Sequence, residues 1–209
     1  MSSSKNRKVE KHMSHWNDEH ALSYDEQWGE LEFHKQIPAL AKVAAQQRIV
    51  EIGCGGGFLS LCLAQHAPGV KILALDPTEK MIALAKERQQ KADLPESQLK
   101  FIKAGAEELA VEDASLDLTL AAFSLHHWQD SKRAMSLIFK GLKPGGRIWL
   151  CEDLNTPLDG DMQVDHSLKS FNGIKTLLEL TGFNDISKSL NTSPEGEFMI
   201  VEAVKPENA

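Results

Sequence analysis

Short apolar segments alternate with amphipathic segments along most of the chain. An apolar run bounded by turn signals is typical of a buried strand. Apolar residues spaced three or four apart are typical of a helix that packs on a core. The apolar runs predict strands at 48–52, 70–75, 99–103, 116–123 and 147–151. The spaced patterns predict helices at 31–46, 58–66, 78–91, 132–142 and 168–181.

Strands that alternate with helices predict a parallel sheet covered by helices on both faces. The cluster Pro144-Gly145-Gly146 is expected to stop one helix before the next strand, and Gly182 to end the last helix. Two further strands, 183–190 and 198–204, are separated only by a turn around Pro194, which predicts an antiparallel hairpin. We therefore predict an α/β fold with a Rossmann-like, doubly wound sheet of about seven strands. It is mostly parallel, with a C-terminal antiparallel hairpin.

Length and composition fit one soluble domain. The chain has 209 residues, of which 42% are hydrophobic and 25% charged, enough for a single large core. No apolar run approaches the roughly 20 residues that a membrane span needs, so no membrane partner is expected. Residues 1–11 are polar and basic and lack the apolar stretch of a secretory signal. We expect residues 1–30 to form a flexible N-terminal tail and possible lid, in which 16–28 is either a short helix or a lid. Residues 31–209 are expected to form the folded domain.

Charge and cysteine content narrow the partners and the compartment. The net charge of −7 disfavours a nucleic-acid partner, because the surface as a whole repels phosphate. Cys54, Cys62 and Cys151 are scattered and odd in number, with neither zinc-ligand spacing nor a disulfide framework. Free thiols suit a reducing compartment, so we expect a cytoplasmic protein.

A glycine cluster follows the first predicted strand and leads into a helix. It reads Gly53-Cys54-Gly55-Gly56-Gly57, preceded by Glu51 in an otherwise apolar strand. Strand, glycine turn and helix together predict a nucleotide site at the carboxyl end of the strand. A dinucleotide fingerprint requires glycine or alanine at its third glycine position, where this chain has Phe58. An NAD-dependent dehydrogenase is therefore the weaker alternative.

Several motifs together resemble those of one enzyme superfamily. They are the glycine motif with Glu51, Asp76 after the second strand, Leu125-His126-His127 after the fourth, and Leu142-Lys143-Pro144-Gly145-Gly146 before the fifth. In order and spacing they resemble class I S-adenosylmethionine (SAM)-dependent methyltransferases, within the broad group that includes quinone-biosynthesis methyltransferases. The resemblance covers roughly residues 31–204. It implies a SAM-binding methyltransferase domain, with S-adenosyl-L-homocysteine as the product of the cofactor.

The resemblance assigns the ribose and the methionine arm of SAM to residues near the glycine motif. Asp76 is expected to accept hydrogen bonds from both ribose hydroxyls, and it can also stabilise the N-terminus of the next helix. Glu51 is expected to orient the glycine loop and the methionine amino group, or to bind the loop alone. Backbone contacts to the arm are expected from the loop residues Gly53, Cys54, Gly55 and Gly57.

Adenine is expected at Gly105-Ala106-Glu107. The matching segment of the superfamily usually begins with aspartate, whose side chain binds the adenine amino group, but this chain has Gly105. That contact is either missing or supplied by another residue, for which Glu107 is the candidate. The backbone N–H of Ala106 can still meet a ring nitrogen, while Pro77 and Met81 are expected to line the other face.

The acceptor side is expected after the fourth strand. Phe123 and Ser124 should pass near the methionine arm. His126 or His127 could act as a base, although a ring there could equally just hold the loop. The acids of Glu152-Asp153-Leu154-Asn155 are expected to be solvated, and no metal is predicted. The histidines nearer the N-terminus also lack ligand spacing and are expected in a solvated tail: His12, His15, His20 and His34.

The connection after the fifth predicted strand is short and contains Asp159-Gly160-Asp161, so it offers little to cover an acceptor site. Trp16, Tyr24 and Trp28 are candidates for an aromatic lid, or they pack on the sheet edge. The leading hypothesis is methylation of a small molecule by in-line transfer. The alternatives are methylation of a protein side chain, or a SAM-binding regulatory subunit without catalysis. None of these patterns fixes an oligomeric state.

Overall fold

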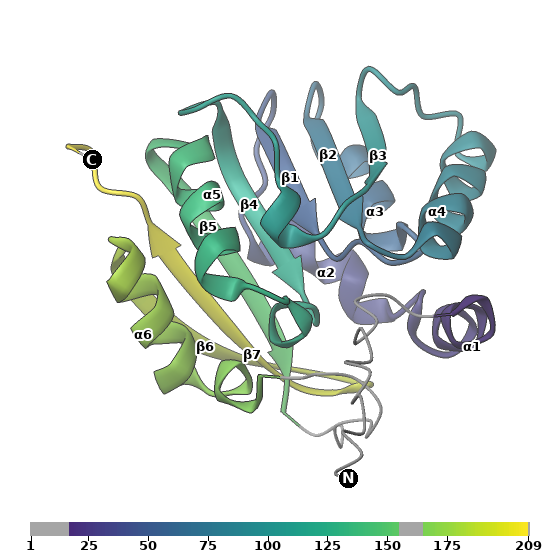
Figure 1. Ribbon diagram of the computed structural model, residues 1–209. Helices are drawn as coiled ribbons and strands as arrows, with labels where there is room; N and C mark the ends of the chain where they lie inside the picture. Colours follow the sequence, from purple (N-terminus) through teal and green to yellow (C-terminus); the bar gives the residue numbers. More distant parts are fainter. Residues whose placement is uncertain (1–16, 155–164, 209) are drawn as a thin grey trace, which may run out of the picture.

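The computed structural model describes residues 17–154 and 165–208. Its centre is a seven-stranded sheet of order β3-β2-β1-β4-β5-β7-β6, with helices on both faces (Figure 1). The strands are β1 Arg48–Ile52, β2 Lys71–Asp76, β3 Leu99–Lys103, β4 Leu116–Ala122, β5 Leu142–Asp153, β6 Asn184–Ser193 and β7 Gly196–Val204. Strands β1 to β5 are parallel, and β7 runs antiparallel to both β5 and β6.

This topology confirms the predicted α/β class and the C-terminal hairpin, in which Ser193 pairs with Gly196 across the turn. Strand β1 lies between β2 and β4, so the chain crosses to the other side of β1 after β3. Such a reversal leaves a crevice at the carboxyl ends of the neighbouring strands, where open α/β sheets bind ligands.

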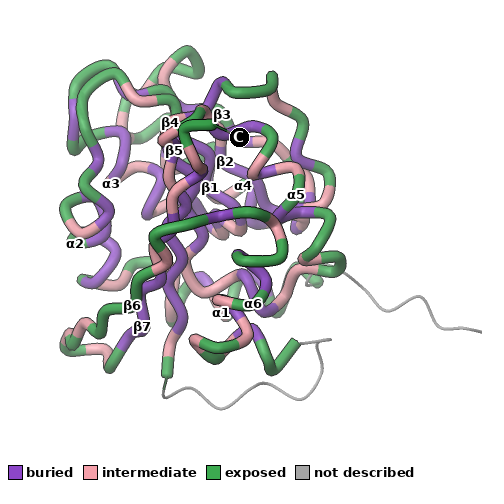
Figure 2. The backbone as a smooth tube through the Cα atoms, turned by 90° about the vertical axis from the view of Figure 1, so that its left-hand side faces the viewer, coloured by how far each residue is buried: buried purple, intermediate pink, exposed green. Residues whose placement is uncertain are grey.

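One apolar layer covers each face of the sheet. Ile49 of β1 joins the layer under α2, α3 and α4, whereas Val50 points to the layer under α5 and α6. This alternation explains why β1 is buried from Ile49 to Ile52 (Figure 2). The helices are α1 Asp18–Trp28, α2 Glu32–Leu40, α3 Phe58–His66, α4 Glu79–Lys91, α5 Ser131–Gly141 and α6 Phe171–Thr181. Short 3-10 turns are η1 Ala106–Glu108, η2 Leu125–His127 and η3 His166–Lys169.

Two predicted helices are shorter than expected. The helix expected over 31–46 ends at Leu40, because Lys42 and Gln46 take left-handed backbone conformations with φ of 53° and 62°. The helix expected from residue 168 begins at Phe171, where the side chain of Ser170 accepts a hydrogen bond from the Gly173 N–H. It ends as predicted at Gly182, which has a φ of 108°.

The fifth strand is longer than predicted, because Pro144-Gly145-Gly146 does not interrupt it. Strand β5 begins at Leu142, and its pairing with β4 shifts register there. Gly145 takes a φ of 75° and donates its N–H to the Lys205 carbonyl, and the Lys205 N–H donates to the Gly146 carbonyl. The helix ends before this cluster as expected, but the strand was predicted to start only at Arg147, and these backbone bonds keep the irregular segment in the sheet.

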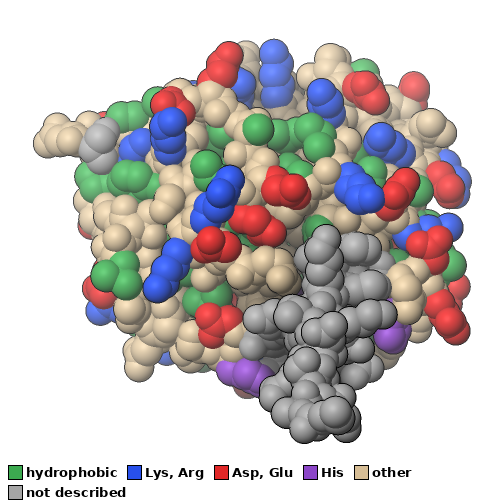
Figure 3. All heavy atoms as spheres, in the orientation of Figure 1, with side chains coloured by type: hydrophobic (Ala, Val, Ile, Leu, Met, Phe, Trp, Pro, Cys, Tyr) green, Lys and Arg blue, Asp and Glu red, His purple; other side chains and the backbone are tan. Residues whose placement is uncertain are grey.

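Helix α1 falls in the segment expected to be a tail. Asn17 caps it by accepting a hydrogen bond from the His20 N–H at 2.8 Å, and the helix packs beside α4 (Figure 1). Over 17–154 and 165–208, no helix is long and apolar enough to cross a membrane. On the face seen in Figure 3, acidic and basic side chains are interspersed.

Candidate functional site

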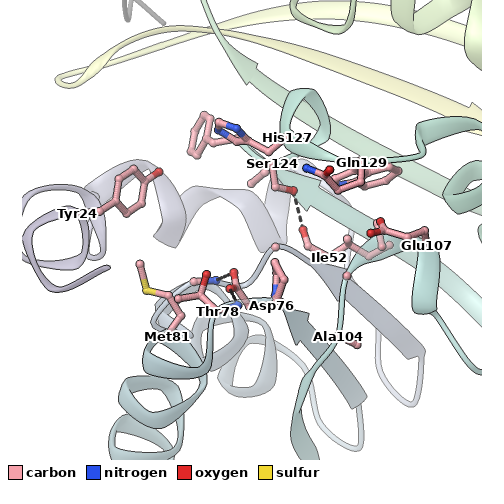
Figure 4. A pocket seen from close by; sticks show the side chains of 18 residues that line it. Tyr24, Ile52, Asp76, Thr78, Met81, Ala104, Glu107, Ser124, His127 and Gln129 are labelled. Atoms are coloured by element: carbon pink, nitrogen blue, oxygen red, sulfur yellow. Dashed lines mark hydrogen bonds between the residues drawn. The ribbon is translucent and has the colours of Figure 1, made fainter. Parts of the chain in front are cut away.

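A pocket opens at the carboxyl ends of β1, β2 and β4, with about 790 Å³ of empty space including its open mouth. In Figure 4, Tyr24 and Glu107 lie on opposite sides of it, with Asp76 and Thr78 between them. Ten of the residues predicted to bind the cofactor line it: Gly53, Gly55, Asp76, Pro77, Met81, Gly105, Ala106, Glu107, Phe123 and Ser124. The site thus forms at the switch point of the sheet.

The glycines of the loop after β1 serve different purposes. A β-carbon on Gly53 would lie 2.3 Å from Cβ of Ser124, and one on Gly57 would lie 2.7 Å from Cβ of Ala85. Both glycines also have positive φ, of 74° and 81°. Gly55 has open space where its β-carbon would be and borders the pocket. The loop is therefore packed closely at both ends and leaves its middle free to approach a ligand.

Asp76 ends β2 inside the pocket and joins two of its walls. One carboxylate oxygen accepts from the Gly55 N–H at 3.0 Å, and the other accepts from the Thr78 N–H at 2.8 Å. Burial raises the pKa of Asp76, while the hydrogen bonds from Thr78 and Gly55 act against that rise. Each carboxylate oxygen has a second lone pair, so Asp76 can still accept hydrogen bonds from a ligand diol.

Glu51 lies beneath the loop and does not line the pocket. It is buried on the α3 side of β1, where the Ser60 hydroxyl donates a hydrogen bond to it at 2.5 Å. Burial raises the pKa of Glu51 to about 8, with the charge of Asp76 adding to the rise and the Ser60 hydrogen bond opposing it. Cys54 and Gly57 also lie outside the pocket wall. The structure thus brings Glu51 to the helix that follows the loop.

In the segment after β3, Glu107 lies beside Gly105, the glycine found where the superfamily usually has aspartate. A β-carbon on Gly105 would lie 2.8 Å from Oε1 of Glu107, so this carboxylate fills the space where a side chain at 105 would begin. The Gly105 N–H donates to Glu108, and the Arg133 side chain donates to the Glu107 carbonyl at 3.0 Å. These bonds hold η1 with the Glu107 carboxylate at the pocket edge.

Only one of the two predicted histidines faces the pocket. His127 lines it, and burial lowers the pKa of His127 to about 3, with electrostatic effects of His126 and Lys169 adding to the fall. His126 lies behind it, with the two rings 4.0 Å apart. Its Nδ1 is 2.6 Å from Oε2 of Glu152, although the angles are not those of a good hydrogen bond. His126 therefore supports the turn from behind.

Two expectations about charged side chains were wrong. Glu152 was expected to be solvated, but its side chain is only 1% exposed, because β5 continues through it and pairs it with Met199 of β7. His34 was expected in a solvated tail, but it is buried beside Phe58 and Phe123, and burial lowers its pKa to about 4. His20 is exposed, as expected.

Other expectations fall partly outside the described residues. Trp16, His12, His15, Asn155 and the segment Asp159-Gly160-Asp161 belong to the ranges 1–16 and 155–164. Within the ranges 17–154 and 165–208, no group of three or more His, Cys, Asp or Glu side chains is arranged to hold a metal ion.

Tyr24 of α1 forms the pocket wall opposite Glu107 (Figure 4). Burial raises the pKa of Tyr24 to about 12, and the negative charges of Asp76, Glu152 and Asp153 add to the rise. Tyr24 therefore remains a neutral phenol that can donate a hydrogen bond. The sequence did not single out six other lining residues, although they lie close to ones that it did: Ile52, Thr78, Ala104, Ala122, Trp128 and Gln129.

The chain is similar to known methyltransferases. Residues 50–150 match the family described as a methyltransferase domain. The 27-O-demethylrifamycin SV methyltransferase of Amycolatopsis mediterranei is 31% identical over 154 residues, which are 74% of this chain and 55% of that protein. The demethylmenaquinone methyltransferase of Thermus thermophilus is 29% identical over 123 residues, 59% of this chain and 54% of that protein. This chain therefore spans about half the length of these relatives.

A solved structure has the same fold. It is the phosphoethanolamine N-methyltransferase 2 of Haemonchus contortus in complex with S-adenosylhomocysteine and phosphomonomethylethanolamine. The TM-score is 0.74 at 20% identity, and the match covers 91% of this chain and 58% of that one.

Proposed function

The chain belongs to the class I SAM-dependent methyltransferases, and from this premise we propose that it transfers a methyl group from SAM to a small-molecule acceptor. The observation that carries the proposal is Asp76, a carboxylate on the pocket wall that is fixed by the backbone of Gly55 and Thr78. A carboxylate held in this way is suited to the two hydroxyls of a ribose.

The remaining parts of SAM follow from the position of the ribose. The pocket-lining residues Gly53, Gly55, Phe123 and Ser124, at the ends of β1 and β4, would hold the methionine arm. Glu51 acts on this arm indirectly, by fixing α3 and the loop through Ser60.

The adenine ring would be held near η1. Pro77 and Met81, which line the pocket, would pack on one face of the ring. The Ala106 N–H would donate to a ring nitrogen, and Glu107 would accept from the exocyclic amino group.

Methyl transfer from a sulfonium is an in-line displacement at carbon. The bond from sulfur to the methyl carbon breaks as the acceptor atom bonds to that carbon, and the acceptor releases its proton. The protein contributes alignment of the acceptor and exclusion of water. Tyr24, His127 and Trp128 line the pocket on the side left for the acceptor. A histidine with a pKa of about 3 is a weak proton acceptor, so His127 orients the acceptor by a hydrogen bond.

Residues 31–209 form the catalytic domain in this proposal, and residues 1–30 contribute a lid through Tyr24. The described thiols of Cys54, Cys62 and Cys151 are free, which supports a reducing compartment such as the cytoplasm. The net charge of −7 favours a small-molecule acceptor over a nucleic acid.

The test is transfer of labelled methyl from SAM. Purified protein should label a component of a metabolite extract and leave a protein lysate unlabelled, whereas Asp76→Ala should label the same component more slowly at low SAM concentration. Labelling of the lysate alone would point to protein methylation. Absence of labelling in both, with intact SAM binding, would point to a non-catalytic subunit.

A further inference from the structure

An arginine on α4 joins helix α1 to the glycine loop. Both terminal nitrogens of Arg88 donate to the two carboxylate oxygens of Asp25, each at 2.8 Å. One of them also donates to the Gly56 carbonyl at 2.8 Å. The Arg88 side chain is 19% exposed and that of Asp25 is 9% exposed. A bidentate arginine–carboxylate pair that is largely buried is stronger than an ordinary ion pair on the surface.

The backbone leaves no spare room around this pair. A β-carbon on Gly56 would lie 2.0 Å from Oδ1 of Asp25 and 2.2 Å from Nη1 of Arg88. Gly56 does not have the positive φ of Gly53, Gly55 and Gly57, so any residue could adopt its backbone conformation. The ion pair therefore accounts for glycine at position 56. A β-carbon on Gly29 would likewise collide with Asp25, at 2.5 Å from Oδ1.

The contacts on either side of the pair reach the pocket. Tyr24 precedes Asp25 on α1 and lines the pocket from the lid side. Gly55 precedes Gly56, lines the pocket, and donates its N–H to Asp76. Arg88 thus binds the residues next to two pocket-lining residues from different elements, although it does not line the pocket itself.

We propose that the Asp25–Arg88 pair is a latch that fixes α1 on the glycine loop, so that Tyr24 closes the pocket only when that loop is in its binding conformation. Asp25 and Arg88 are positioning residues in this scheme. The latch rests on the proposed function in so far as the ligand that it responds to is SAM or its demethylated product.

Glu30 provides a matched control, because it contacts the same arginine. Its Oε1 is 3.1 Å from Nε of Arg88, but its side chain is 57% exposed, so water screens the pair. Asp25→Asn and Glu30→Gln make the same chemical change on either side of one guanidinium. If Arg88 only needed a negative charge nearby, both substitutions would loosen α1 to the same degree. If the latch is correct, only Asp25→Asn loosens it.

The experiment measures backbone amide exchange of residues 18–28 and the calorimetric affinity for S-adenosylhomocysteine in full-length protein. In Asp25→Asn we expect exchange to be faster by about tenfold or more, which is the low end for loss of a charged hydrogen bond. The affinity should fall by about tenfold, and the ligand should no longer protect α1. In Glu30→Gln both quantities should stay within about threefold of the wild type.

Gly56→Ala should reproduce the effects of Asp25→Asn without changing any charge, because the added methyl pushes the pair apart. If Asp25→Asn does not fold, Arg88→Lys replaces it, since lysine keeps the charge but cannot bind both carboxylate oxygens in the same plane.

Equal exchange of α1 in Asp25→Asn and Glu30→Gln would overturn the latch. Faster exchange with unchanged affinity would overturn its link to the pocket. If wild-type protein bound no S-adenosylhomocysteine, the proposed function would fail, and the exchange comparison would still decide whether the pair docks α1.

Discussion

The Glu107 carboxylate stands where a side chain on Gly105 would begin, since a β-carbon at 105 would be 2.8 Å from its Oε1. Glu107 therefore occupies the space that an aspartate at position 105, common in the superfamily, would need. The carboxylate at the proposed adenine edge of the pocket thus comes from two residues further along the chain than the superfamily's aspartate.

Glu107→Ala should weaken S-adenosylhomocysteine binding by about 1–2 kcal/mol, because it removes a charged acceptor for the adenine amino group. Adding Gly105→Asp to that variant should restore affinity, while Gly105→Asp alone should change little, because it displaces only the flexible end of Glu107. Isothermal titration of the three variants measures this. Unchanged affinity in Glu107→Ala would show that adenine binds elsewhere.

Glu51 should make stability depend on pH. Its folded pKa of about 8 lies above the ordinary 4.5, so the folded state retains a proton that the unfolded state loses. Between these values stability falls as pH rises, by up to about 1.4 kcal/mol per unit, and the loss is complete above pH 8.

Glu51→Gln should flatten this slope while keeping an acceptor for the Ser60 hydroxyl. Denaturant unfolding of both proteins between about pH 6.5 and 8.5 isolates the effect as the difference between their slopes, because both carry the same buried histidines, whose ordinary pKa of 6.5 contributes equally to each curve. Parallel curves for the variant and the wild type would mean that Glu51 is ionised in the folded protein.

His127 and His126 should respond differently to substitution. His127→Ala should slow labelled methyl transfer by about tenfold or more and leave cofactor affinity unchanged, because it removes only a group that orients the acceptor. His126→Ala should instead lower the free energy of unfolding by about 1–3 kcal/mol, because the buried Glu152 carboxylate loses its partner. With a pKa of about 3, His127 should produce no acid limb in the rate between about pH 5 and 8. Such a limb, abolished by His127→Ala, would identify it as the base.

The sequence predicted the bounds of those strands whose ends are set by neighbouring residues in the chain. Strands β1 and β3 match their predicted bounds, because each is a short run rich in β-branched, leucine or aromatic residues that ends just before turn residues. Strand β5 was predicted to start too late, because Pro144-Gly145-Gly146 reads as a break and only the distant backbone of Lys205 keeps it in the sheet.

Distant partners also explain what was missed at the site. Buried Glu152 lies beside His126 from the loop after another strand, and α1 is bound by Arg88, 63 residues from Asp25. The sequence named Tyr24 as a lid residue from its aromatic character, but nothing local could indicate that its neighbour binds α4.

Calorimetric titration of the purified protein with SAM, S-adenosylhomocysteine and NAD tests the proposed use of the pocket most directly. SAM and its product should bind in the micromolar range and NAD should not. Asp76→Ala should weaken SAM binding by about 1–3 kcal/mol, because the ribose hydroxyls lose a charged acceptor. Binding of NAD without binding of SAM, or SAM binding that Asp76→Ala leaves unchanged, would contradict the assignment of this pocket to SAM.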